Sequence, residues 1–204
     1  MSAPKPTSES TIGVFLSSLA SKEPTPGGGA AAALTGATAA ATASMVVEYS
    51  LGKKKLEAHE ESNAAARDYL RRARVKFLTL GDDDAIGYAK LNTLWKLDKD
   101  DPKRIKEWDA TVEDAITPPL EIVSLGVDLM RLLEALCATT NRMLKSDLGV
   151  AAVLCDAASR SAAFNVRINL PMMPEDARTP IESELNKQLE QIHDLCAQIE
   201  ERCS

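Results

Sequence analysis

Residues 24–47 read PTPGGGAAAALTGATAAATASMVV, a turn rich in Pro and Gly that runs into a stretch of small, uncharged residues. Pro and Gly break helices, so this turn separates a short amphipathic helix over residues 12–19 from the next one. The small residues predict a second helix over residues 30–49 that is apolar on nearly every side. Such a helix belongs in the centre of a protein, where its small side chains let neighbouring helices approach closely.

The rest of the chain shows helical periodicity, interrupted by residues that typically begin or end helices. Ala is abundant and aromatic residues make up only 4% of the chain, which favours helices over strands. The sequence therefore predicts an all-α fold of about eight helices, arranged as an antiparallel bundle with short connections. Later helices are predicted to begin near Leu56, Asp82, Pro102, Thr117, Ser146 and Thr179.

The length of the chain, 204 residues, is enough for one domain that buries a large core without disulfides. We expect a loose tail over residues 1–8 and a single helical domain over residues 9–204. The apolar central helix and the amphipathic last helix leave apolar surface uncovered, which predicts a homodimer.

The composition argues against several classes of function. A net charge of −6 is the wrong sign for a protein that binds nucleic acid. The four cysteines form no Cys-x-x-Cys pair and have no histidine at metal-ligand spacing, so we expect reduced thiols in a cytoplasmic protein and no metal site. The stretch 30–47 approaches the length of a membrane span, but Ala, Thr, Gly and Ser gain little from lipid. No membrane partner is therefore expected.

Two motifs flank the predicted central helix. Gly27–Gly29 expose backbone N–H groups at the positive end of the helix dipole, which suits an anion or the polar edge of a ring. The alternative is a turn that only changes the direction of the chain. Lys53–Lys55 follow the helix, either as solvated residues at its C-terminus or as a cluster that attracts carboxylates.

A third group of polar residues lies near the two ends of the helix predicted to begin at Ser146. Asp147 is either a helix cap or an acid in a pocket, and Asn141 lies just before it. Asn165 and Asn169 share one face of an Ala-rich helix, although Asn is a poor helix former. Buried amides need hydrogen-bond partners, so these two indicate a polar pocket or an interhelical hydrogen bond.

Taken in order, these motifs resemble those of the cyclodeaminase/cyclohydrolase family, which includes bacterial methenyltetrahydrofolate cyclohydrolases. The glycine turn with its small-residue helix matches the first block of the family, and Gly52-Lys53-Lys54-Lys55 matches the next. Two later blocks are matched by Ser146-Asp147-x-Gly149-Val150-Ala151 and by Ala162-Ala163-Phe164-Asn165-Val166-x-Ile168-Asn169. The resemblance implies a helical, dimeric protein that acts on one-carbon adducts of tetrahydrofolate without a metal or nucleotide cofactor.

Two blocks depart from the family pattern. Thr140-Asn141-Arg142-Met143 stands where the family usually has Gly-Asn-x-Asn, and Asp82-Asp83-Asp84-Ala85-Ile86 stands where it has an acidic residue followed by Ala and Phe.

The activity that the resemblance implies is hydrolysis of 5,10-methenyltetrahydrofolate to 10-formyltetrahydrofolate. Cyclodeamination of formiminotetrahydrofolate is the enzymatic alternative, and a non-catalytic folate-binding protein or helical scaffold is the other. Addition of water to the bridging carbon needs a carboxylate in a partly dry cleft, a role that we assign first to Asp147 and second to Asp82. One cleft is expected to hold Asp147, Asn165 and the glycine turn. The predicted substrate-binding residues are Pro26, Gly27, Gly28, Gly29, Lys53, Lys54, Lys55, Asn141, Ser146, Asn165 and Asn169.

Overall fold

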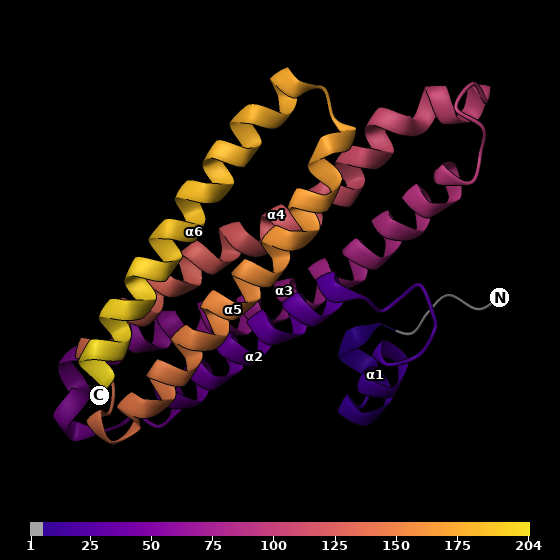
Figure 1. Ribbon diagram of the computed structural model, residues 1–204. Helices are drawn as coiled ribbons and strands as arrows, with labels where there is room; N and C mark the ends of the chain where they lie inside the picture. The colour runs from indigo at the N-terminus through magenta and orange to yellow at the C-terminus, as the bar shows by residue number, and fades with distance from the viewer. Residues whose placement is uncertain (1–5) are drawn as a thin grey trace.

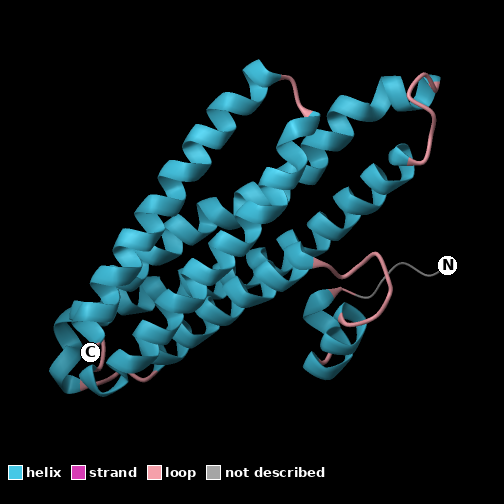
Figure 2. Cartoon of the chain, viewed as in Figure 1, coloured by secondary structure: helices cyan, strands magenta, loops and turns pink. Residues whose placement is uncertain are grey.

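Residues 6–204 are described in a computed structural model, and this range forms a bundle of long helices without a strand (Figures 1 and 2). The α-helices of the range are α1 (Ile12–Leu19), α2 (Gly28–Glu48), α3 (Glu60–Trp95), α4 (Pro102–Thr139), α5 (Lys145–Asn169) and α6 (Glu175–Cys203). Short 3₁₀ helices are η1 (Thr7–Glu9), η2 (Lys54–His59), η3 (Arg142–Leu144) and η4 (Leu170–Met172). The all-α prediction is confirmed.

The long helices run up and down beside one another (Figure 1). α2 packs against α3 and α5, and α4 packs against the same two helices, so α2 to α5 form a four-helix bundle. α6 lies against α4 and α5, while α1 stands apart beside the start of α2 (Figure 1). The antiparallel arrangement is as predicted.

α2 is the central helix that its small residues predict. Ala39, Ala40 and Ala43 have no exposed surface. The contact with α3 is close enough that a Cβ at Gly36 would lie 2.7 Å from the ring of Phe77. Small residues thus bring the helix axes together, and the core is filled by the larger side chains of the neighbouring helices.

α3 is one continuous helix of 36 residues, so the prediction of a new helix at Asp82 is wrong. Gly81 is buried where α3 meets α2, and a Cβ there would lie 2.8 Å from the Cβ of Ala33. This packing holds the backbone helical at a point where Gly and three Asp residues favour a break. Asp82 does not cap a helix. Its Oδ1 accepts hydrogen bonds from the backbone N and the Oγ1 of Thr7, at 3.1 and 2.6 Å.

α4 is also continuous, over 38 residues, and the predicted helix start at Thr117 is wrong. Pro118 and Pro119 lie inside the helix, and each lacks the N–H that would bond to the carbonyl four residues earlier. For Pro119 that carbonyl belongs to Ala115, and Asn169 Nδ2 of α5 donates to it at 3.4 Å. Both prolines are buried, so packing and the hydrogen bond from Asn169 keep the helix continuous. The two continuous helices reduce the predicted number from about eight to six within residues 6–204.

α5 and α6 both begin earlier than the sequence predicts. α5 starts at Lys145, and no side-chain hydrogen bond caps it, so Ser146 and Asp147 are not its caps. α6 starts at Glu175, which places Pro180 in its second turn instead of at its first position. Two acidic residues in the first turn favour this earlier start because they interact well with the helix dipole.

The N-terminal segment and α2 bear on two further predictions. Residues 1–5 of the predicted tail lie outside the described residues, and Thr7 is anchored to Asp82 instead of being loose. Within residues 6–204, α2 alone has the length and hydropathy of a helix that could cross a membrane. Of that stretch, 56% is buried by other parts of the chain, as in the core helix of a bundle.

Candidate active site

The glycine turn opens one end of the bundle, which we call the glycine end: Gly27–Gly29, Asp84, Asn165 and Asn169. The Thr25–Pro26 peptide bond is cis, and α2 begins directly after Gly27. No side chain caps this helix. The backbone N–H groups of its first turn therefore have no partner within the helix. Gly29 and Ala30 are buried and Gly28 is exposed, so a ligand can approach this turn at Gly28.

Asp84 of α3 lies directly against this turn. Its carboxylate occupies the space that a Cβ at Gly29 would need. Burial raises the pKa of the Asp84 carboxyl from its ordinary value of 3.8 to about 6. A carboxyl group with a pKa in this range is suited both to accept and to return a proton near neutral pH.

α5 brings two amides to the same place. A Cβ at Gly28 would lie 3.4 Å from Asn165 Oδ1, so the predicted approach of the glycine turn to Asn165 is observed. Asn165 Nδ2 donates to the carbonyl of Ser161 at 3.1 Å, which leaves Oδ1 to face the turn. Asn169 Nδ2 donates to the carbonyls of Asn165 and Ala115, at 3.1 and 3.4 Å. Asn169 therefore fastens α5 to α4 beside the site.

The other predicted site residues lie at the opposite end of the bundle, which we call the lysine end: Lys53–Lys55, Asn141, Ser146 and Asp147. The three lysines are exposed, and the Asn141 backbone N–H donates to Ser50 Oγ at 2.9 Å. Asp147 and Asn165 lie 18 residues apart on α5, a rise of about 27 Å. The expectation that one cleft holds Asp147 and the glycine turn is therefore wrong within a single chain.

Asp84 is the acidic residue that the sequence analysis missed at this site. Asp82, the second choice after Asp147, lies two positions earlier on α3 and binds Thr7. Positions three apart share a helix face, so Asp84 lies on the same side of α3 as Gly81, which packs against α2. If the helix had been predicted to continue through residues 81–84, the spacing of Asp84 from Gly81 would have placed Asp84 on the side of α3 that faces α2. The predicted helix break at Asp82 prevented this inference.

Comparison with known proteins places the chain in a family. Residues 11–191 match the sequence model of the formiminotransferase-cyclodeaminase family. Because this match spans most of the chain, the protein belongs to that family, and the resemblance drawn from the motifs is confirmed.

Particular relatives are enzymes of folate metabolism. The chain is 34% identical over 166 residues to the methenyltetrahydrofolate cyclohydrolase of Methylorubrum extorquens, a match that covers 78% of each chain. It is 30% identical over 167 residues to the formimidoyltransferase-cyclodeaminase of Sus scrofa, which covers 80% of this chain and 31% of the relative. The crystal structure of formiminotetrahydrofolate cyclodeaminase from Thermotoga maritima superposes with a TM-score of 0.89 at 28% identity and covers 96% of both chains.

Proposed function

We propose that the protein is a methenyltetrahydrofolate cyclohydrolase, which converts 5,10-methenyltetrahydrofolate to 10-formyltetrahydrofolate. The observation that carries this proposal is the half-buried carboxyl group of Asp84, which lies against Gly29 at the uncapped start of α2, while Asn165 faces the neighbouring Gly28. The match to the cyclohydrolase of Methylorubrum extorquens, which extends over 78% of that relative, supports this reaction within the family.

The chemistry of the substrate suits this carboxyl group. The bridging carbon of the substrate shares a positive charge with the two nitrogens that it joins, so an ionised Asp84 stabilises it. Water adds through its oxygen to the bridging carbon while Asp84 takes one of its protons. The bond from this carbon to N5 then breaks as Asp84 returns the proton to N5. Loss of the hydroxyl proton leaves the formyl group on N10.

The remaining groups of the glycine end are proposed to bind the pterin ring. The first-turn N–H groups of α2 are donors and Asn165 Oδ1 is an acceptor, and both are needed at the polar edge of a pterin. No atom lies within 4 Å of the position of a Cβ at Gly27, so a flat ring has room to approach the backbone. Water and side chains balance the reaction, so we propose that it needs no metal or organic cofactor. Full activity after dialysis against a chelator is the expected result.

We also propose that the protein is a homodimer that buries the face shared by α2 and α5. Large apolar side chains at the C-terminal end of α2 and on α5 are exposed: Met45, Tyr49, Val150 and Val153 are 38%, 62%, 51% and 46% exposed. A twofold axis perpendicular to these helices would bring the lysine end of a second copy to the glycine end of the first. Asp147 and Lys53–Lys55 would then reach the folate across the interface. A monomeric mass by light scattering at micromolar concentration would contradict the dimer.

Cyclodeamination is the second candidate, and the similarity to the cyclodeaminase structure of Thermotoga maritima favours it. That reaction expels ammonia from the formimino group of 5-formiminotetrahydrofolate and forms the same methenyl bridge. Ammonia release from this substrate, measured with a coupled dehydrogenase, separates it from hydrolysis.

The deciding experiment is incubation of the purified protein with 5,10-methenyltetrahydrofolate. We expect loss of the near-ultraviolet absorbance of the substrate and 10-formyltetrahydrofolate as the chromatographed product. Asp84→Asn is the control for catalysis by contaminants and for uncatalysed hydrolysis. Binding of 5-formyltetrahydrofolate without turnover of either substrate would instead support a non-catalytic folate-binding protein.

A further inference from the structure

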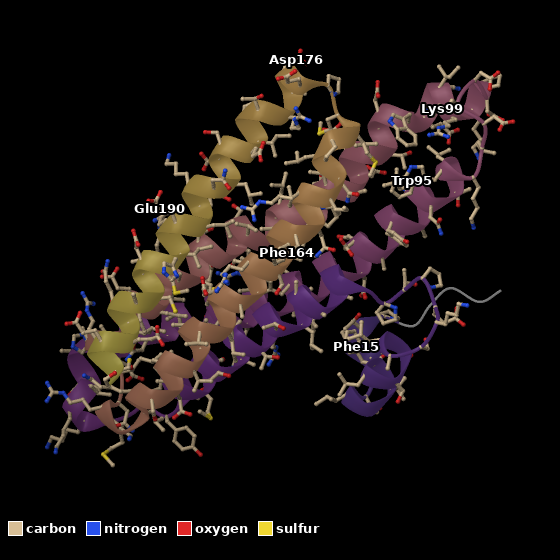
Figure 3. The ribbon with its side chains drawn as sticks, in the orientation of Figure 1. Phe15, Trp95, Lys99, Phe164, Asp176 and Glu190 are labelled. Atoms are coloured by element: carbon tan, nitrogen blue, oxygen red, sulfur yellow. The ribbon has the colours of Figure 1, made fainter. Side chains whose placement is uncertain are left out.

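Two cysteines lie at the lysine end, where α6 finishes beside the turn that joins α4 to α5 (Figure 1). Cys137 is in the last turn of α4, and Cys203 is the last residue of α6. Figure 3 shows Glu190 midway along α6, which continues from there to the lysine end. Both cysteine side chains are half-buried free thiols, and both pack against the edge of the hydrophobic core. Two different helices therefore each bring a thiol to this end of the bundle.

Contacts between the helices bring the two cysteines together. Arg202, which directly precedes Cys203, pairs with Glu134 of α4 at 3.2 Å. Glu134 lies three residues before Cys137 and therefore shares its face of α4. A Cβ at Gly149 of α5 would lie 3.5 Å from the Cβ of Cys203. Cys203 is thus seated between α4 and α5, on the side of α4 that carries Cys137.

Cys203 lies close enough to Cys137 to affect its ionisation. Burial raises the pKa of the Cys137 thiol from 9.0 to about 11, and the neighbouring Cys203 thiol adds to the rise. Arg202 and Lys145 partly offset it, because positive charges favour the thiolate. The thiolate is the form that attacks a disulfide, so Cys137 attacks slowly and the first attack falls to Cys203. Helix ends fray, so the backbone at Cys203 can adjust to the geometry that a disulfide requires.

The other two cysteines offer an internal comparison. Cys155 of α5 has no exposed surface, and Cys196 of α6 is 5% exposed. The Cys155 thiol donates to the carbonyl of Gly126 at 3.4 Å, inside the bundle. Burial raises the pKa of the Cys155 thiol to about 12 and that of the Cys196 thiol to about 11. A dissolved reagent therefore reaches Cys137 and Cys203 well before it reaches this second pair.

We propose that Cys137 and Cys203 form a site of reversible oxidation, at which a low-molecular-weight disulfide such as oxidised glutathione converts the two thiols to a disulfide bond between α4 and α6. The Cys203 thiolate attacks one sulfur of the small disulfide, which breaks its S–S bond and releases one small thiolate. Cys137 then gives its proton to water and attacks the Cys203 sulfur, which releases the second small thiolate. Two protein thiols are oxidised, and the small disulfide is reduced to two thiols.

The fold favours the second step and benefits from the product. The two sulfurs are held by the same helix ends, so the second attack is intramolecular and proceeds at a high effective concentration. The bond closes the loop of residues 137–203, which restricts the unfolded chain and so stabilises the folded one. An excess of small thiol reverses both steps. The site does not depend on the proposed folate activity, so the failure of either proposal leaves the other in place.

The test treats the reduced, purified protein with oxidised glutathione, blocks free thiols by alkylation and digests the product with trypsin without a reductant. We expect a linked peptide pair, residues 132–142 joined to residues 203–204, lighter by two hydrogens than the two peptides together and lost on treatment with dithiothreitol. The matched control, Cys155→Ala combined with Cys196→Ala, should keep this link. A link between Cys155 and Cys196 in its place, or no link in the wild type, overturns the proposal.

Single substitutions test the order of attack. Cys137→Ser leaves Cys203 without its partner, so the reaction should stop at a stable mixed disulfide with glutathione on Cys203. Cys203→Ser should gain glutathione about 10-fold more slowly, because the remaining thiol is rarely ionised. Circular dichroism checks that both variants are folded. Equal rates for the two variants would overturn the assignment of Cys203 as the attacking thiol.

A melting experiment tests whether the native fold accommodates the bond. We expect the oxidised wild type to have a Tm about 5 °C above that of the reduced protein. Cys137→Ser and Cys203→Ser should show no such rise after the same treatment. A Tm that is unchanged or lower in the linked protein would show that the bond forms only by distorting the helix ends, and it would overturn the proposal.

Discussion

The two ends of the bundle differ in how their polar groups are held. At the glycine end, α2, α3 and α5 bring backbone N–H groups, a half-buried carboxyl and an amide to one place. At the lysine end, the three lysines are exposed. The Asn141 backbone N–H donates to Ser50 Oγ, and Asn63 Nδ2 donates to the carbonyl of Thr139, so these polar groups join the ends of helices. Chemistry on a cationic carbon needs a positioned carboxylate in a partly dry site, and the glycine end offers one within a single chain.

The largest expected effect is on catalysis, and it distinguishes Asp84 at the glycine end from Asp147 at the lysine end. Asp84→Asn should lower kcat/KM for methenyltetrahydrofolate by about 10²–10³-fold, because it removes the group that accepts and returns the proton. The exposed neighbour substitution Asp83→Asn should change it by less than about threefold. Asp147→Asn removes a carboxylate that would reach the folate across the proposed interface, and its loss should be smaller than that of Asp84→Asn. Stopped-flow absorbance measures all three. A larger loss for Asp147→Asn than for Asp84→Asn would move the chemistry to the lysine end of a second copy.

The glycine turn gives the next comparison, between two adjacent positions. Gly29→Ala places a Cβ where the Asp84 carboxylate lies, so we expect a loss of about 1–3 kcal/mol in the free energy of unfolding and of most activity. Gly27→Ala meets no atom within 4 Å, and its stability should change by less than about 0.5 kcal/mol. Urea denaturation of both variants measures the difference. Equal losses would show that backbone freedom, and not the space for Asp84, makes glycine necessary.

The pKa of Asp84 predicts opposite effects on activity and stability. Its folded-state pKa is raised from 3.8 to about 6, so the wild type loses stability as pH rises between these values, and the loss is complete above them. Asp84→Asn should therefore be more stable than the wild type by about 1–3 kcal/mol at pH 8 and by much less at pH 4. Over the same range kcat/KM of the wild type should rise with a midpoint near pH 6. A flat rate profile would mean that another group is the base.

The smallest effect concerns the hydrogen bond that supports the site. Asn169→Ala leaves the carbonyl of Ala115 without its donor and should cost about 1–2 kcal/mol of stability. Pro119→Ala restores an N–H that can bond to that carbonyl, so the cost of Asn169→Ala should shrink in the Pro119→Ala background. A double-mutant cycle measured by urea denaturation gives the coupling. Additive losses would show that the two residues are energetically independent.

The all-α class and the buried central helix were predictable because they follow from local composition, as the uncharged stretch that became α2 shows. The breaks at Asp82 and Thr117 were predicted wrongly because tertiary packing holds both segments helical: Gly81 against Ala33, and Pro119 beside the amide of Asn169. The meeting of Asn165 with the glycine turn was predictable from two motifs.

The identity of the acid was not predictable in the same way. Three consecutive Asp residues differ only in the direction that each faces on α3, and this direction depends on whether the helix is continuous. Asp147 belongs to a family motif, but the motif does not say which end of a long helix lies beside the glycine turn. The direction of each Asp on α3 and the end of α5 that lies beside the glycine turn both depend on packing between helices, which no single segment of the sequence determines.

The hydrogen bonds of Asn169 make its role depend on whether position 119 is a proline. Its Nδ2 serves both the carbonyl of Ala115, which Pro119 leaves without a donor, and the carbonyl of Asn165 beside the candidate site. A relative that replaces Pro119 with a residue that has an N–H no longer needs this amide for its fourth helix. Among relatives, residues at positions 119 and 169 are therefore expected to vary together, with the amide retained wherever the proline is.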